Sequence, residues 1–147
     1  GKRAPIAERM LKAIVAPQFA ARDYKLNPAR VYVVGYNDGG VVAARVEVMQ
    51  PGIFKGAIYI SGAVHWGDKL PPKIDQVRQN RHAFIVGNLD NNMSDIQRVQ
   101  QAYGRDGVAY TELIVIPNHG DRWPGPSYFQ RAIEFLDAGA GDRSVQP

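Results

Sequence analysis

The stretch Val34-Gly35-Tyr36-Asn37-Asp38-Gly39-Gly40 decides the fold prediction for this chain. It follows the apolar run 31–34, whose β-branched composition is typical of a strand buried on both faces of a parallel sheet. A helical pattern over residues 38–49 comes next, and Pro51-Gly52 ends it. Gly35 and Gly39 would let the strand and the helix pack closely around a residue held in a strained turn.

This frame has the spacing of the nucleophile elbow, G-x-S-x-G, between a strand and a helix. The central residue is Asn37, which tolerates a positive φ but has no hydroxyl to deprotonate. A Walker loop is excluded because the Gly-Lys-Ser/Thr ending is absent, and the Rossmann spacing does not fit.

The remaining pattern alternates strands with helices, which predicts an α/β fold with a mainly parallel sheet of about four strands in sequential order. Functional side chains of such sheets gather at the carboxyl ends of the strands. The run 31–34 would form an open edge strand. Ser94 to Gln97 reads as a capping box. The further elements expected are helices over 5–22, 94–103 and 126–137, strands over 56–62, 83–87 and 111–116, and a loop with a short helix over 65–80.

Composition indicates a single domain over residues 1–137 and a flexible tail over 138–147. Of the 147 residues, 45% are apolar and 22% charged, as in ordinary globular proteins. The net charge of +4 is scattered and accompanies no nucleic-acid-binding motif, and no run is long and apolar enough to span a membrane. We therefore expect neither nucleic acid nor membrane as a partner, and no cofactor. The absence of cysteine and of a signal peptide in this chain favours the cytoplasm.

Two further segments match the same family as the elbow. Ile58-Tyr59-Ile60-Ser61-Gly62 is a strand that ends in small residues, and Gly87-Asn88-Leu89-Asp90 is a G-x-x-D segment. With the elbow, they make residues 5–137 resemble the α/β-hydrolases, particularly small bacterial esterases of the dienelactone-hydrolase and polyhydroxybutyrate-depolymerase type. The resemblance implies that Asn37 stands at the nucleophile position and that Asp90 orients the catalytic base.

The position of that base has two interpretations. The family reads V-P-G-x-G-H-x-x-P before a last helix, and residues 116–124 here read Ile-Pro-Asn-His-Gly-Asp-Arg-Trp-Pro. Without gaps the family's histidine falls on Asp121, and a shift of two residues would place His119 there. The ungapped agreement at Pro117, Gly120 and Pro124 favours Asp121.

The resemblance also implies early strands that this sequence does not contain, so the chain would be half of a larger fold. Two functions are expected from it. The first is a catalytically degenerate esterase relative that serves as a binding or scaffold module for an ester-like small molecule. The second is a serine-hydrolase relative seen as a fragment or nucleophile variant, with Asp90 and His119 as the remaining triad members. The open edge predicts a homo-oligomer or a partner segment.

Other candidate residues have simpler interpretations. We expect His65 to be a loop histidine packed beside Trp66 and His82 to be structural. Asp38 would favour the helix dipole rather than act as an acid. Three alternatives remain. His65, Asp90, His119 and Asp121 could form a metal site, and Ser61 could be a displaced nucleophile. Tyr36, Trp66 and Trp123 could form an aromatic rim at the top of the sheet.

Overall fold

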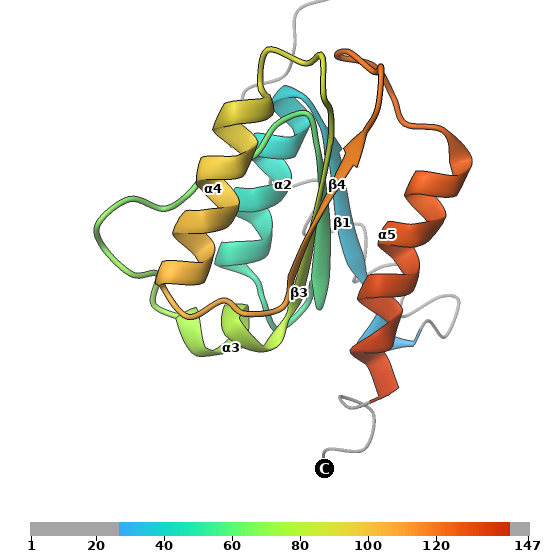
Figure 1. The fold of residues 1–147 in the computed structure, drawn as a ribbon. Coiled ribbons are helices and arrows are strands. Elements are labelled where there is room, and N and C mark those ends of the chain that lie inside the picture. The colour runs from blue at the N-terminus through green and yellow to red at the C-terminus, as the bar shows by residue number, and fades with distance from the viewer. Residues whose placement is uncertain (1–26, 142–147) are drawn as a thin grey trace, which may run out of the picture.

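The computed structural model describes residues 27–141, which form a parallel sheet with helices on both faces (Figure 1). The strand order β1-β2-β3-β4 follows the sequence, and all three pairings are parallel. This confirms the predicted fold class; the helix predicted over 5–22 lies outside the described residues. The elements are η1 (Pro28–Arg30), β1 (Tyr32–Tyr36), α2 (Asp38–Met49), β2 (Gly56–Ile60), α3 (Ile74–Gln79), β3 (Arg81–Gly87), α4 (Met93–Arg105), β4 (Thr111–Ile116) and α5 (Pro126–Ala138).

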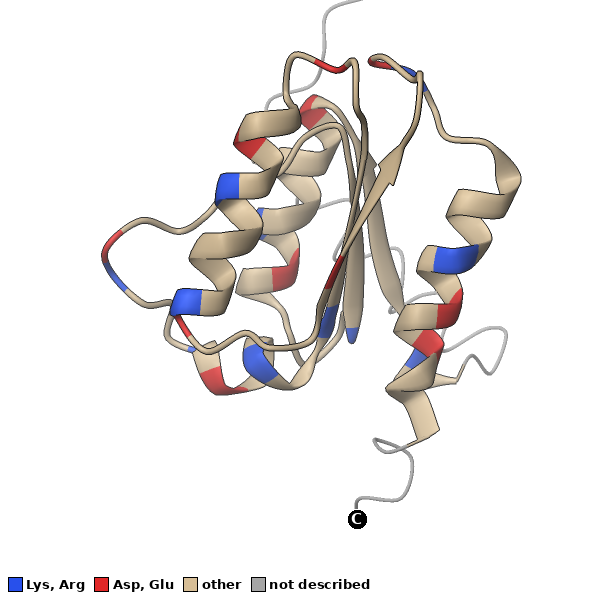
Figure 2. Cartoon of the chain, viewed as in Figure 1, with Lys and Arg blue, Asp and Glu red and all other residues tan. Residues whose placement is uncertain are grey.

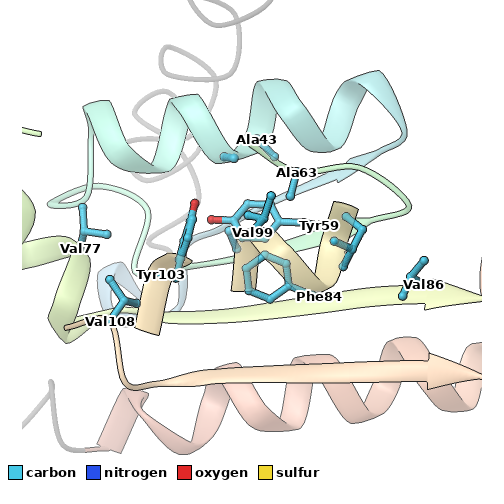
Figure 3. Close-up of a cluster of buried hydrophobic side chains, with 12 residues drawn as sticks. Ala43, Tyr59, Ala63, Val77, Phe84, Val86, Val99, Tyr103 and Val108 are labelled. Carbon is cyan, nitrogen blue, oxygen red and sulfur yellow. The ribbon is translucent and has the colours of Figure 1, made fainter. Parts of the chain in front are cut away.

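The two faces of the sheet bury separate apolar clusters. The helices α2 and α4 cover one face, where aromatic rings from β2, β3 and α4 pack together (Figure 3). The helix α5 covers the other face, on which isoleucines of β2, β3 and β4 meet Ala132 and Leu136. The strands β2 and β3 lie between both layers, which explains their continuous apolar sequences.

The elbow strand β1 is less buried than predicted. Val34 is 38% exposed, whereas every residue of β2 is buried. Helix α5 packs mainly against β2, β3 and β4, and it reaches β1 at Tyr32, whose hydroxyl donates to Asp137 over 2.8 Å. Within residues 27–141, β1 pairs with β2 alone and is an edge strand, as expected.

The predicted capping box is wrong. Helix α4 begins at Met93, so Ser94 lies inside its first turn, and Asn92 stands at the cap position without a side-chain cap bond. The Asn92 side chain instead donates to the Ser61 carbonyl over 2.9 Å. This bond ties the start of α4 to the end of β2, and the helix runs past Gly104 to Arg105.

The last helix extends through Ala138, and Ala140 beyond it is buried. The packed part of the chain therefore continues into the segment predicted as a tail. The rest of that segment, residues 142–147, lies outside the described part.

None of the helices in the described part of the chain is long and apolar enough to cross a lipid bilayer.

Candidate functional site

Asn37 occupies a strained turn between β1 and α2. Its backbone has φ 55° and ψ −118°, a positive-φ conformation that Asn adopts more readily than most residues. Its N–H donates to the Ile60 carbonyl over 2.7 Å, and its carbonyl accepts from Gly40 N–H over 2.9 Å. The turn therefore presents the Asn37 side chain at the carboxyl end of the sheet, where its amide bonds to Asp121.

Backbone contacts at glycines hold this turn in place. A Cβ on Gly35 would lie 1.9 Å from the Gly39 carbonyl oxygen, and one on Gly62 would lie 2.1 Å from the Asn37 carbonyl oxygen. A Cβ on Gly40 would meet the Gly62 carbonyl oxygen at 1.9 Å. Any side chain at these positions would push the elbow away from β2, so the small residues at the ends of β1 and β2 are a geometric requirement.

Asp121 lies directly opposite Asn37. The Asn37 amide Nδ2 donates to Asp121 Oδ2 over 2.7 Å, and the Tyr36 hydroxyl donates to Asp121 Oδ1 over 2.7 Å. The Tyr36 hydroxyl also lies 2.9 Å from the Asp121 carbonyl oxygen. Hydrogen bonding to Asp121, assisted by desolvation and by the negative charges of Asp121 and Asp90, raises the pKa of Tyr36. Both carboxylate oxygens of Asp121 are thus fixed by donors from the elbow.

His119 is turned away from the elbow residue. Its Nε2 lies 3.0 Å from the Arg122 carbonyl oxygen, so that nitrogen carries the proton and donates it there. Its Nδ1 lies 3.5 Å from Arg122 Nη2. Its backbone carbonyl accepts from Leu89 N–H and is the atom that a Cβ on Gly87 would strike at 1.9 Å. Of the two positions considered for the base, the structure brings Asp121 to Asn37, while the His119 ring bonds within its own loop.

Asp90 lies close by at the end of β3. It is only 6% exposed, and its Oδ1 accepts from Asn92 N–H over 2.8 Å. Its Oδ2 is buried and has no hydrogen-bond partner. Asp90 therefore lies at the carboxyl end of the sheet, as Asn37 does.

The contacts within this cluster are hydrogen bonds to Asp121. The side chains facing Asp121 are an amide and a phenol, and no serine hydroxyl joins them. Ser61, the alternative nucleophile, is 1% exposed, so a substrate cannot reach it. At this end of the sheet, acidic residues (red in Figure 2) lie at the start of α2 and in the loops after β3 and β4. No group of three or more His, Asp or Glu residues within 27–141 could hold a metal ion.

The predicted aromatic rim forms only in part. The rings of Tyr36 and Trp123 lie 6.0 Å apart, centroid to centroid, beside Asp121. Trp66 lies elsewhere: its ring packs 4.7 Å from that of Tyr103 in α4, and its indole N–H donates to Asp106 at the end of that helix. The loop after β2 folds down over α4, which takes Trp66 away from the site.

Two histidine predictions are confirmed. His65 stacks 4.3 Å from Trp66, and its Nε2 donates to Asp106 over 2.8 Å while its Nδ1 accepts from Gly67 N–H. His82 is fully buried, accepts from the Tyr59 hydroxyl at Nδ1 and donates to the Val77 carbonyl from Nε2. Neither ring has a free nitrogen for catalysis or for a metal, so a metal site that includes His65 is wrong.

Sequence reasoning missed the direct contact between Tyr36 and Asp121 and the role of Asn92 in linking β2 to α4. Tyr36 was already expected at the top of the sheet, and its place as the last residue of β1 puts its hydroxyl within reach of the loop that carries Asp121. Asn92 gave no such signal, because its partner is a backbone carbonyl 31 residues away.

No protein-family model and no curated protein sequence matches the chain. Several solved structures, however, are similar to it. A carboxylesterase from Bacillus cereus superposes with a TM-score of 0.66 at 16% identity, over 91% of this chain and 61% of the other. A carboxylesterase from Mesorhizobium loti superposes with a TM-score of 0.64 at 19% identity, over 86% of this chain and 59% of the other. Acyl-protein thioesterase 2 from Zea mays superposes with a TM-score of 0.61 at 15% identity, over 90% of this chain and 66% of the other.

The chain has the α/β-hydrolase fold. At these identities the likeness concerns the fold alone. The chain also spans between 59% and 66% of the lengths of these three proteins, so their activities do not pass directly to it.

Proposed function

We propose that this chain is a carboxylesterase relative that has lost acyl transfer and uses the elbow site to bind a small ester-like molecule. The observation that carries the proposal is the 2.7 Å hydrogen bond between Asn37 Nδ2 and Asp121 Oδ2. A working hydrolase needs a hydroxyl or thiol at the elbow and a neighbouring base that takes its proton. Here an amide donates to a carboxylate, so the pair holds its geometry without a nucleophile.

The same bond supports Asp121 as the residue at the histidine position. Asp121 reaches Asn37 from the loop after β4, whereas His119 in that loop bonds to Arg122. With Asn37 and Asp121 at these two positions, Asp90 is the one triad member that matches the family pattern. What remains is a site with fixed donors and acceptors that suits binding.

The second candidate is a serine-hydrolase relative in which a change at position 37 alone removed activity, with His119 as the base. Its support is that His119 and Asp90 lie on adjacent loops, linked by the bond from Leu89 N–H to the His119 carbonyl. In this version the His119 ring would have to leave the Arg122 carbonyl and turn to position 37.

Restoring the two positions tests the proposal. The natural chain, Asn37→Ser and the double variant Asn37→Ser/Asp121→His would be assayed with p-nitrophenyl acetate and with a fluorophosphonate label read by intact mass. We expect no turnover and no label on the natural chain, and label at position 37 in the double variant, because only that variant pairs a hydroxyl with an imidazole base. Label on the natural chain at any residue of the site would contradict the proposal.

A third change separates the two candidates. If Asn37→Ser alone gains turnover, and adding His119→Ala removes it, the second candidate is correct. If His119→Ala leaves the labelling of the double variant unchanged, Asp121 holds the histidine position. Far-ultraviolet circular dichroism of each variant serves as the folding control.

We further propose that the open edge of β1 pairs with a second copy or another protein segment. Val34 is 38% exposed there, and β1 has a sheet neighbour on one side only within the described residues. An exposed edge with apolar side chains favours pairing. A monodisperse monomer of this chain in multi-angle light scattering at micromolar concentration would overturn the homo-oligomer.

A further inference from the structure

A cavity of about 220 Å³ lies between α2 and the loop after β2, on the face of the sheet that α2 and α4 cover. In the described part of the chain its walls are formed by Ala44, Arg45, Val48, Val64, His65 and Trp66. None of these residues takes part in the elbow site. Because a cavity of about 150 Å³ holds benzene, this one has room for a benzene ring that carries one small substituent.

The apolar part of the wall is held in place by the core. Val48, Val64 and Trp66 pack against the buried cluster on this face of the sheet. The centroid of the Trp66 ring lies 4.3 Å from that of His65 and 4.7 Å from that of Tyr103. The His65 and Tyr103 rings are 6.0 Å apart, well under the sum of these two distances, so they do not enclose the indole between them. Part of the indole therefore remains available to line the cavity.

The unpaired charge at the wall is positive. Arg45 is exposed, and no hydrogen bond, ion pair or cation–π contact joins its guanidinium to another residue within 27–141. The acidic group that the wall contacts, Asp106, is occupied, because its Oδ2 accepts from both His65 Nε2 and the Trp66 indole N–H. A guanidinium can donate two parallel hydrogen bonds to a carboxylate. We therefore expect a ligand of this cavity to carry a carboxylate.

We propose that this cavity binds a small aromatic carboxylate, with the carboxylate on Arg45 and the ring against Val48, Val64 and Trp66. The indole favours an aromatic ring over an aliphatic chain of the same size, because pairs of aromatic rings gain attraction beyond the area that they bury. The negative charge of the ligand matches the unpaired cation of the described wall. The site is separate from the elbow, so the inference does not depend on the proposed function.

The two tryptophans of the chain report on the two sites separately. Trp66 lines the cavity, and Trp123 lies beside Tyr36 at the elbow, so a ¹⁵N–¹H spectrum of the full chain gives one indole signal for each site. The chain would be titrated with benzoate and, separately, with benzamide, which has nearly the same shape and no charge. We expect benzoate to cause a saturable shift of the Trp66 signal and to leave the Trp123 signal in place.

Two substitutions separate the charge from the apolar wall. Benzoate should bind about fivefold more tightly than benzamide, the upper range for an ion pair at a protein surface, and Arg45→Gln should remove that difference by weakening benzoate alone. Val48→Phe should abolish the Trp66 shift with both ligands, because the larger side chain fills the cavity. The matched control is Arg98→Gln, which removes the same charge from an exposed pair with Asp95 on α4 and should leave both affinities unchanged.

Three results would overturn the inference. They are the absence of a saturable Trp66 shift with benzoate, equal affinities of the natural chain for benzoate and benzamide, and an unchanged benzoate affinity in Arg45→Gln. If Val48→Phe does not fold, the comparison of the two ligands on the natural chain and on Arg45→Gln decides alone, because Arg45 is exposed and its replacement leaves the core intact. Ester hydrolysis by the natural chain would contradict the proposed function and leave these titrations interpretable.

Discussion

The molecule contains two polar clusters, each with a carboxylate oxygen that has no partner, and they differ in depth. Asp90 lies after the carboxyl end of β3, and its Oδ2 has no hydrogen-bond partner. Glu47 lies inside the layer between the sheet and α2, where it is fully buried. In this second cluster Glu47 Oε1 accepts from Asn80 Nδ2 over 2.8 Å, and Oε2 accepts nothing.

The surroundings decide what each carboxylate can do. Burial raises the pKa of Glu47 to about 8, although its bond from Asn80 acts in the opposite direction. The nearby Tyr59 and Tyr103 also have raised pKa values, chiefly from burial, and their hydroxyls point toward one another (Figure 3). Glu47 is therefore a neutral acid at pH 7, packed within the core. Asp90 is also buried, but it lies after the end of β3, and the pair formed by Asn37 and Asp121 at the same upper end of the sheet is exposed.

The largest expected effect is on the scaffold of the upper cluster. Gly62→Ala places a Cβ 2.1 Å from the Asn37 carbonyl oxygen, a backbone atom that can move only with the elbow. We expect it to lower the free energy of unfolding by about 3 kcal/mol, measured by urea denaturation.

The matched control is Gly104→Ala in α4, where an added Cβ meets nothing within 4 Å. It should stabilise the chain by up to about 1 kcal/mol, since alanine favours helix more than glycine does. Equal effects of the two substitutions would show that the elbow is not held by this contact.

The next effect concerns the lower cluster and depends on pH. Because the folded pKa of Glu47 is raised, folding takes up a proton between about 4.5 and 8, and the stability contributed by the neutral form is lost as pH rises through that window. Glu47→Gln removes this loss and keeps an oxygen for Asn80. Between pH 6.5 and 8 we expect the variant to gain about 2 kcal/mol relative to the natural chain, measured by denaturation at each pH.

The measurements start at pH 6.5 because the protonation of His82 also changes the free energy of unfolding below that pH. Burial lowers the pKa of His82 to about 4, so its stability contribution is lost as pH falls from 6.5 toward 4, opposite in sign to that of Glu47. A flat difference between Glu47→Gln and the natural chain across pH 6.5 to 8 would contradict the neutral, buried state of Glu47.

The smallest expected effect compares the backbone strain at Asn37 with the hydrogen bond from Asn37 to Asp121. Asn37→Gly relieves a positive φ of 55° and removes the bond to Asp121. We expect a net gain of up to about 1 kcal/mol in the free energy of unfolding, because strain at such a residue outweighs one exposed hydrogen bond. A clear loss of stability would mean that the Asn37–Asp121 bond itself holds the two loops together.

The sequence was sufficient for the fold because its signals are local. The apolar strands, the glycines around Asn37 and Pro126 at the start of α5 all act on their immediate neighbours. Within residues 27–141, each expected strand and helix forms within a few residues of its predicted position. The capping box failed because a contact across the fold, from Asn92 to the Ser61 carbonyl, governs the start of α4.

The sequence indicated candidate residues for the site but not their connections. The family resemblance pointed to Asn37, Asp90 and Asp121, whereas the orientation of His119 toward Arg122 depends on loop geometry that no spacing encodes. Trp66 was misplaced for the same reason, since nothing in residues 61–73 indicates that the loop folds over α4. The burial of Glu47 was not visible either, because a glutamate on a helix is normally exposed.

The glycine contacts at the elbow have a consequence for how this chain can change over generations. They join backbone atoms to backbone atoms, so the shape of the turn does not depend on which side chain stands at position 37 or 121. In the genetic code, an asparagine codon becomes a serine codon, and an aspartate codon a histidine codon, by one base substitution each. Serine at position 37 and histidine at position 121, the two changes used above to test the proposed function, are therefore two point mutations away and leave these backbone contacts in place.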